Sequence, residues 1–321
     1  MTVRIEVGDC LEVLRGLPEC FRVNCCVTSP PYFGLRDYGH GGQIGLEATP
    51  DAYVAKLVEV FREVRNHLED DGTLWLNLGD SYASSTTNNG GYSDKSTLAG
   101  FTRADTKGRI ANESGSRRRI EHGAKPKDLL GIPWRVAFAL QADGWYLRQD
   151  IIWHKPNPMP ESVTDRCTKA HEYIFLLSKS ARYYYDAKAI AEPATYAGRV
   201  LDYTGDQKNN LTDDVLQATR PKNRKITVAD TRNRRSVWTV TTKPYSGAHF
   251  ATFPPDLIEP CILAGCPEGG TVLDPFGGAG TTGLVADRHH RNALLIELNP
   301  EYAELARNRI SDDAPLLSTL T

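Results

Sequence analysis

The chain has 321 residues, of which 40% are hydrophobic and 24% are charged. This balance excludes a wholly disordered chain and is typical of one large α/β domain or two smaller domains. No stretch approaches the ~18 consecutive apolar residues of a membrane-spanning helix. The start, MTVRIEVGDC, lacks the pattern of a secretory signal, and the seven cysteines have no framework spacing. We therefore expect a cytoplasmic protein with reduced thiols and no structural metal.

The net charge of −2 hides two basic segments. Residues 103–127 carry eight basic and three acidic side chains, and residues 220–235 carry seven basic and one acidic side chain. Basic segments on an otherwise acidic chain are typical of contact with a polyanion, although solvated loops would have the same composition.

The first part of the chain alternates between strand and helix patterns. We expect a strand over 3–9, a helix over 10–18, an apolar β-prone run over 23–32 that two prolines end, a helix over 50–72 and a strand over 73–82. This alternation predicts a doubly wound, mostly parallel sheet with helices on both faces.

Two polar segments interrupt the pattern, one over 83–126 and one over 187–236. We expect the first to be a basic insertion that is mobile on its own. Between and after them, the sequence predicts a helix over 128–144, a strand over 145–155, a closing antiparallel hairpin of 171–180 with 182–186, a helix over 256–266, and a strand–turn–helix–strand–helix unit over 271–310.

The last unit contains a GxGxxG pattern at Gly278, Gly280 and Gly283, placed after a strand and at the start of a helix. Glycines allow a ligand to approach the backbone, and free N–H groups at a helix start favour a carboxylate or phosphate. Glu297 ends the next strand, where an acid accepts hydrogen bonds from ribose hydroxyls. A tight turn beside a surface acid would also fit. Too little chain follows this turn for a nicotinamide enzyme, so the strand order must be permuted.

A second motif, Thr28-Ser29-Pro30-Pro31-Tyr32, closes the buried strand near the start of the chain. Ligands bind at the carboxyl ends of strands in a doubly wound sheet. The prolines fix an extended backbone with exposed carbonyls, Ser29 adds a hydroxyl, and Tyr32 adds a flat aromatic face. Acceptors beside a stacking surface suit the exocyclic amino group of a nucleobase that has left its duplex. The prolines would equally end a strand with no further role.

Together the two motifs resemble those of the amino-group DNA methyltransferases that use S-adenosylmethionine, in the permuted order called β. In that order the catalytic turn (28–32) precedes the cofactor turn (274–280). The resemblance covers nearly the whole chain. It implies a Rossmann-like methyltransferase fold, with 1–82 and 127–186 as the catalytic half, 237–321 as the cofactor-binding part and 187–236 as the target-recognition region.

The resemblance also implies residue roles. The catalytic tetrapeptide is Ser29, Pro30, Pro31 and Tyr32. Family members with Ser in its first position mostly methylate N4 of cytosine, and those with Asp or Asn mostly methylate N6 of adenine, so adenine remains an alternative. The implied cofactor-binding residues are Asp9, Phe253, Asp274, Phe276, Gly278, Gly280, Thr281, Thr282, Glu297 and Asn299, with His249 and Phe250 in the segment that leads into the cofactor part.

The basic segments are then candidates for contact with double-stranded DNA. The candidate DNA-binding residues are Arg36, Arg117, Arg118, Arg119, Arg220, Lys222, Arg224, Lys225, Arg232, Arg234 and Arg235. A cognate restriction endonuclease and a homodimer are partners that the family resemblance leaves open. An RNA or protein amide methyltransferase is less favoured because it usually places the cofactor turn first, and a DNA-binding module with a dead site is less favoured because both motifs are intact.

Cys261 follows a proline, as the nucleophile of C5-cytosine methyltransferases does. Its surroundings, DLIEPCILAGC, predict an apolar helix rather than a loop after a strand. We therefore expect Cys261 to be buried and inert, and Cys25 and Cys26 to belong to the core.

Overall fold

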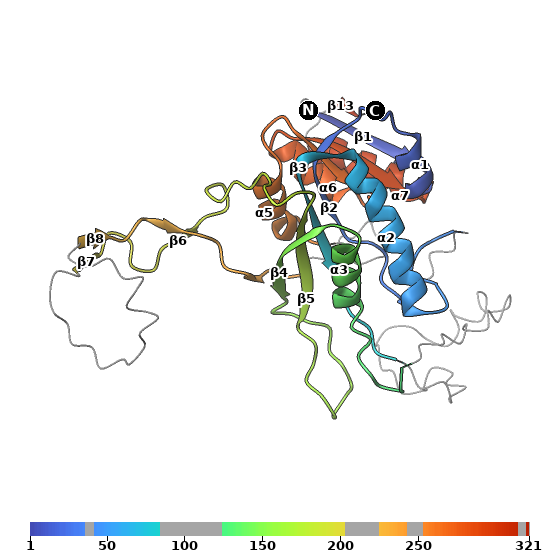
Figure 1. Cartoon of the computed structure of the whole chain (residues 1–321), viewed down its shortest axis with the longest axis horizontal. Helices are drawn as coiled ribbons and strands as arrows, with labels where there is room; N and C mark the ends of the chain where they lie inside the picture. Colours follow the sequence, from blue (N-terminus) through green and yellow to red (C-terminus); the bar gives the residue numbers. More distant parts are fainter. Residues whose placement is uncertain (36–41, 84–123, 203–224, 243–252, 314–318, 321) are drawn as a thin grey trace.

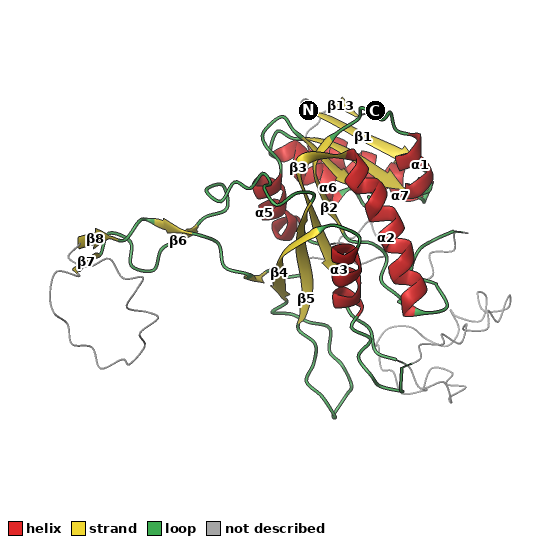
Figure 2. Ribbon diagram, in the orientation of Figure 1, coloured by secondary structure: helices red, strands yellow, loops and turns green. Residues whose placement is uncertain are grey.

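The structure is a computed structural model that describes residues 1–35, 42–83, 124–202, 225–242, 253–313 and 319–320. A nine-stranded sheet runs through the body, in the order β10-β4-β5-β3-β2-β11-β12-β1-β13 (Figures 1 and 2). The strands are β1 (Thr2–Val7), β2 (Val23–Thr28), β3 (Leu68–Leu78), β4 (Tyr146–His154), β5 (His171–Ser178), β10 (Val237–Thr239), β11 (Thr271–Asp274), β12 (Asn292–Glu297) and β13 (Thr319–Leu320).

In this sheet β5 runs antiparallel to β3 and to β4, and the other strand pairs are parallel. Helices cover both faces. One face carries α1 (Cys10–Gly16), α2 (Pro50–His67) and α3 (Ile132–Ala142), and the other carries α5 (Pro255–Gly265), α6 (Thr281–Arg288) and α7 (Pro300–Asp313). The predicted doubly wound, mostly parallel α/β fold is confirmed.

Alternation along the strands creates the two cores. Cys26 and Leu74 point to the α1–α2–α3 side, whereas Cys25 and Trp75 point to the α5–α6–α7 side, and all four are buried. Strands covered on both faces need mainly apolar residues, which is why residues 25–27 of β2 and 74–76 of β3 are uninterrupted apolar runs. The expectation that Cys25, Cys26 and Cys261 are buried is confirmed, and burial raises the pKa of all three thiols.

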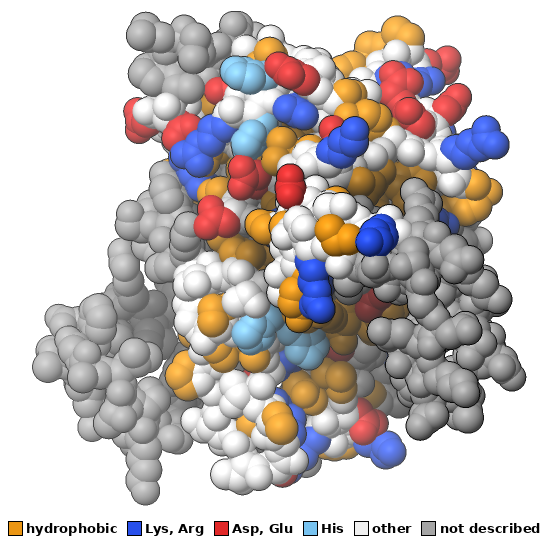
Figure 3. All heavy atoms as spheres, turned by 90° about the vertical axis from the view of Figure 1, so that its left-hand side faces the viewer, with side chains coloured by type: hydrophobic (Ala, Val, Ile, Leu, Met, Phe, Trp, Pro, Cys, Tyr) orange, Lys and Arg blue, Asp and Glu red, His pale blue; other side chains and the backbone are white. Residues whose placement is uncertain are grey.

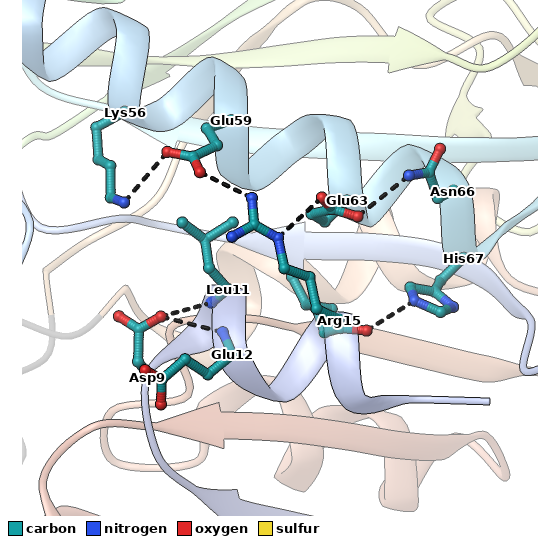
Figure 4. A network of polar contacts seen from close by, with 10 residues as sticks. Asp9, Leu11, Glu12, Arg15, Lys56, Glu59, Glu63, Asn66 and His67 are labelled. Atoms are coloured by element: carbon teal, nitrogen blue, oxygen red, sulfur yellow. Dashed lines mark hydrogen bonds and ion pairs between the residues drawn. The ribbon is translucent and has the colours of Figure 1, made fainter. Parts of the chain in front are cut away.

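The first two helices begin at side-chain caps and are joined by an ion-pair cluster. The Asp9 carboxylate accepts from the backbone N–H groups of Leu11 (2.9 Å) and Glu12 (3.1 Å) at the start of α1. Arg15 of α1 reaches across to Glu59 (2.8 Å) and Glu63 (3.2 Å) of α2 (Figure 4). Because these groups are largely exposed, the buried leucines beneath them contribute more to stability than the ion pairs do.

One predicted pairing is wrong. The closing antiparallel pair is β4 with β5, and residues 182–186 form no strand. Instead the backbone of this segment bonds to neighbouring elements, with Tyr184 N–H donating to Asp71 O and Asp186 N–H donating to Ala264 O, both at 2.9 Å. Tyr185 stacks on Trp75 with ring centroids 6.3 Å apart. Both edges of β5 are already paired, so the aromatic segment packs on the sheet's face.

The described parts of residues 187–236 form a projecting arm rather than an irregular region. Two short antiparallel pairs build it, β6 (Glu192–Pro193) with β9 (Thr231–Arg232), and β7 (Val200–Asp202) with β8 (Lys225–Thr227). Figure 1 shows these strands extending away from the body beside β4. Among the described residues, no helix has both the length and the apolar character needed to cross a membrane.

Replacement of Gly265 by Ala should destabilise the fold. A Cβ atom at this position would lie 2.5 Å from Trp75 Nε1 and 2.8 Å from Thr73 Oγ1, where α5 meets the sheet. We expect the free energy of unfolding, measured with urea, to fall by about 1–3 kcal/mol. Gly16→Ala is the matched control, because a Cβ there meets nothing within 4 Å. An equal effect of both substitutions would contradict this packing argument.

Candidate active site

The two sequence motifs meet at the carboxyl ends of adjacent strands. β2 and β11 pair in parallel, with Cys26 opposite Leu273. The chain leaves β2 for α2 on one face of the sheet and leaves β11 for α6 on the other. In an open α/β sheet, the carboxyl edge at such a divergence is the usual ligand site. The 28–32 turn and the 274–280 loop flank this point.

The Asp274 carboxylate links the two motifs directly. The Thr28 hydroxyl donates to its Oδ1 at 2.6 Å, and the Thr282 hydroxyl donates to its Oδ2 at 2.6 Å. The backbone N–H of Phe276 also donates to Oδ1, at 3.0 Å. Asp274 is 1% exposed. Residues 246 positions apart are thereby held in contact by a fully buried acid.

Burial raises the pKa of Asp274 from 3.8 to about 6. The hydrogen bonds from Thr28, Thr282 and Phe276 oppose this shift, and the negative charge of Glu297 adds to it. The three groups that donate to Asp274 are all neutral, and none of the described donors is a cation. When Asp274 is ionised, its negative charge is therefore not balanced by its hydrogen-bond partners. The loop therefore favours a positively charged ligand beside it.

The glycines of the loop have two different roles. Gly278 has φ +51°, and a Cβ there would meet only Phe276 O at 3.9 Å, so the space beside it is open. Gly280 has φ +74°, but a Cβ there would lie 2.7 Å from the Ala306 Cβ of α7. The chain therefore needs glycine at 280 for the close approach of α7, whereas Gly278 leaves room for a ligand against the backbone.

The acid at the end of β12 lies over this open position. Glu297 accepts from Gly278 N–H through Oε2 (2.7 Å) and from Asn299 N–H through Oε1 (2.9 Å). β1 lies beside β12, with Val7 opposite Glu297, so Asp9 follows at the same edge. Carboxylate oxygens beside an open glycine backbone suit the hydroxyls of a ribose, which is the donor set that an adenosine cofactor requires.

The other predicted cofactor residues that the structure describes contact the protein itself. The Thr282 hydroxyl is directed at Asp274, and Thr281 accepts a hydrogen bond from Arg309 of α7 at 2.9 Å. Both threonines therefore hold the loop in place in this structure. Phe276 and Phe253 are partly buried against opposite cores. His249 and Phe250 lie outside the described residues.

The 28–32 turn presents a hydroxyl and a carbonyl. Ser29 is half-buried, with Oγ 3.5 Å from the Tyr32 hydroxyl. The Tyr53 hydroxyl donates to the Pro31 carbonyl at 2.8 Å, which fixes the turn on α2. In the described part of the chain no group donates to the Pro30 carbonyl. Ser29 Oγ and the Pro30 carbonyl are thus two acceptors from consecutive residues.

Tyr32 sits in a polar cluster that the sequence did not reveal. Its hydroxyl lies 2.7 Å from Glu172 Oε2 and 3.2 Å from Asn77 Oδ1, and Lys155 pairs with the other Glu172 oxygen. Burial and the charge of Glu172 raise the pKa of Tyr32 well above its usual value. The one signal in the sequence was Asn77, a polar residue within the apolar run of β3. Glu172 was missed because the pairing of β5 was predicted wrongly.

The candidate DNA-binding residues divide into three groups. Arg36, Arg117, Arg118, Arg119, Arg220, Lys222 and Arg224 lie outside the described residues. Arg232 and Arg235 both pair with Glu192, at 3.4 and 3.0 Å, so their charges are partly compensated. Lys225 lies in β8 of the arm, and Arg234 stacks over Trp238 at 4.8 Å.

Arg234 also lines a cavity of about 310 Å³ at the root of the arm, together with Arg148, Tyr183 and Tyr185, and no acidic residue is among those described around it. Figure 3 views the side from which the arm projects and shows basic and acidic side chains intermixed on its described surface. The described surface on this side is therefore not uniformly positive. Attraction of a polyanion there must come from particular basic segments.

Asp274→Asn should change how stability depends on pH. The folded pKa of about 6 lies above the ordinary 3.8, so wild-type Asp274 favours folding at low pH and loses that contribution as pH rises through about 6. The variant lacks this titration. From about pH 4 to about pH 7, the unfolding free energy of wild type should fall relative to the variant by up to about 3 kcal/mol in urea denaturation. A relative gain by wild type over that range would contradict the burial of an ionisable carboxyl.

Comparison with known proteins identifies the family of this chain. The N6/N4 methyltransferase family model, described as DNA methylase, matches residues 23–308. The chain is 50% identical to the Type II methyltransferase M.SmaI of Serratia marcescens, over 96% of this chain and 90% of that protein. It is 48% identical to the Type II methyltransferase M.Cfr9I of Citrobacter freundii, over 95% and 87% of the two chains.

Solved structures share the fold. A putative DNA modification methylase from Thermus thermophilus, complexed with S-adenosyl-L-methionine, superposes with a TM-score of 0.57 at 24% identity, over 99% of each chain. The PvuII DNA methyltransferase, described as cytosine-N4-specific, superposes with a TM-score of 0.59 at 20% identity, over 99% of this chain and 96% of the other. The family match and the extended identity to Type II enzymes show that this chain belongs to the N6/N4 DNA methylase family, whose methyl donor is S-adenosylmethionine.

Proposed function

We propose that the protein methylates the exocyclic N4 amino group of cytosine within a short duplex DNA sequence, after the base has flipped out of the helix. The observation that carries the proposal is the contact between Thr28, next to the Ser29 turn, and Asp274 in the Gly-rich loop. This contact holds two acceptors suited to a nucleobase amino group, Ser29 Oγ and the Pro30 carbonyl, near the Gly-rich loop suited to the cofactor. The choice of cytosine depends on Ser29, since relatives of this family with Ser at that position mostly act on N4.

The residues around the Gly-rich loop fit the cofactor. Open space beside Gly278 and the carboxylate of Glu297 suit its ribose, and the negative charge of Asp274 suits its cationic end. S-adenosylmethionine, when bound there, supplies a methyl group on a positively charged sulfur that leaves as a neutral thioether. We propose that Gly278, Glu297, Asn299 and Asp9 bind it, and that Thr281 and Thr282 act by holding the loop.

The catalytic turn prepares the amino group. The nitrogen lone pair of cytosine N4 is conjugated into the ring, which makes it a poor nucleophile. Hydrogen bonds from its two N–H groups to Ser29 Oγ and the Pro30 carbonyl favour a pyramidal nitrogen and free that pair. That pair would then take the methyl group from the sulfonium, which would leave as the neutral thioether, and the methylated nitrogen would release one proton to solvent once the base departs. Positioning and exclusion of solvent supply most of the rate.

We also propose that the arm, residues 187–236, recognises the target sequence. Its described strands project from the body, as a segment that contacts a duplex beyond the crevice would. Arg234 is the described cation we favour for phosphate contact, because Arg232 and Arg235 share Glu192. Such an enzyme acts in the cytoplasm, where a cognate restriction endonuclease would be its partner in a Type II system.

Purified protein should transfer tritiated methyl groups from S-adenosylmethionine to duplex DNA, and mass spectrometry of the digested DNA should find N4-methylcytosine. Ser29→Ala should lower kcat by about 10²- to 10³-fold, as the loss of a preorganised polar contact does, while calorimetric cofactor affinity is kept. Ser162→Ala, at an exposed serine between β4 and β5, is the control. N6-methyladenine instead would overturn the base assignment, and no transfer to varied DNA would overturn the function.

Removal of the arm should abolish methylation of DNA without loss of cofactor binding. Pro193 and Thr231 lie directly opposite each other, so residues 194–230 can be replaced by an Asn-Gly turn. The shortened protein should bind S-adenosylmethionine with the affinity of the intact chain and lose sequence-specific transfer. Unchanged methylation at the same sites would show that recognition lies elsewhere.

A further inference from the structure

We infer that Glu172 is a positioning residue that fixes the direction of the Ser29 hydroxyl, so that Ser29 accepts a hydrogen bond from the target amino group rather than donating one to the base. The inference rests on the function proposed above and deepens it. Glu172 lies at the start of β5, the reversed strand, and touches the catalytic turn only through Tyr32.

A chain of polar contacts runs from Ser29 to Lys155. Ser29 Oγ lies 3.5 Å from the Tyr32 hydroxyl, which lies 2.7 Å from Glu172 Oε2. The Lys155 ammonium contacts Glu172 Oε1 and lies 4.2 Å from the centre of the Trp153 ring. The side chains of Lys155 and Glu172 are only 18% and 16% exposed. The far end of the chain is thus a paired carboxylate with little access to water.

Counting the hydrogens gives the chain one direction. A tyrosine hydroxyl has one proton, and a carboxylate paired with an ammonium has none to give. The short, charge-assisted contact therefore directs the Tyr32 proton to Glu172. The Tyr32 oxygen is left as an acceptor, and the Ser29 proton points to it. The lone pairs of Ser29 are then left to accept a hydrogen bond.

Two neighbours bound the Tyr32 side chain. Asn77 donates through Nδ2 to Tyr173 O (3.0 Å) and to Glu172 Oε2 (3.3 Å), so its Oδ1 faces the Tyr32 hydroxyl at 3.2 Å as a second acceptor, which is neutral and more distant than the charged Glu172 oxygen at 2.7 Å. Gly79 packs directly on the Tyr32 ring, where a Cβ would lie 2.5 Å from Cε2. The ring and its hydroxyl are therefore held from two strands, β3 and β5.

This direction matters for the reaction. A free serine hydroxyl can donate to the ring nitrogen of cytosine or accept from its amino group, and only the second interaction withdraws the amine lone pair from conjugation. A hydroxyl that already donates its proton is also a stronger acceptor, because hydrogen bonds in a chain polarise one another. Glu172 thereby acts on the amino group through two intervening hydroxyls.

Glu172→Gln tests this inference. The Gln amide can donate to the Tyr32 oxygen, which would turn the Tyr32 proton back towards Ser29. We expect kcat to fall by about 10- to 100-fold, while KM for DNA and for S-adenosylmethionine changes less than about threefold. Glu161→Gln is the matched control, since Glu161 pairs with Arg166 and has 27% side-chain exposure. Glu161→Gln should keep the wild-type kcat.

A double-mutant cycle with Tyr32→Phe separates this role from a structural one. Tyr32→Phe leaves Ser29 without its acceptor and should lower kcat about as much as Glu172→Gln does. The double variant should be no slower than Tyr32→Phe alone, because Glu172 acts only through that hydroxyl. Multiplied effects, or a wild-type kcat in either single variant, would overturn the inference.

The cycle also distinguishes this inference from the proposed function. If wild-type protein transfers no methyl group, the function fails before any variant is compared. If wild type is active and Tyr32→Phe keeps its kcat, the polar chain has no role, whether or not Glu172→Gln folds. Thermal unfolding and calorimetric cofactor binding of each variant identify effects that come only from lost structure, and a fall in kcat accompanied by equal losses there would count against the inference.

Discussion

The buried carboxylate of Asp274 is the interaction on which the site depends. It fills its two oxygens with the hydroxyls of Thr28 and Thr282 and with the Phe276 N–H. A buried charge is stable only when it is well hydrogen-bonded, so the acid imposes one arrangement on the strand end and on the loop around it. The same acid that costs stability because of its burial therefore fixes the two motifs side by side.

The reversed strand β5 supplies the second layer of the site. In a parallel sheet, side chains at the active edge come from the carboxyl ends of strands. An antiparallel strand brings its amino end to that edge instead, which is how Glu172 and His171 reach it. Polar groups at the start of β5 therefore support the catalytic turn, while the apolar remainder of the strand, Ile174 to Leu177, is buried in the cores.

The two motifs and the basic segments lie in different parts of the fold. The motifs follow strand ends whose positions are set by two apolar cores, as a reaction that depends on alignment requires. Two segments, 103–127 and 220–235, are enriched in basic side chains, and the structure describes an arm for part of the second. The rest of the chain has a net acidic composition, which limits unspecific attraction of a polyanion.

Local patterns in the chain predict the alternation of strands and helices, the two motifs and their order, and the buried cysteines, because apolar periodicity and glycine or proline positions are local properties. Long-range packing sets the rest: β5 pairs with β4 and β3, Gly280 allows the close approach of α7 while Gly278 faces open space, and Glu172 contacts Tyr32. These contacts depend on which distant strands pair with each other and on how closely a loop and a helix approach. Packing between residues far apart along the chain produces no periodic pattern in the sequence.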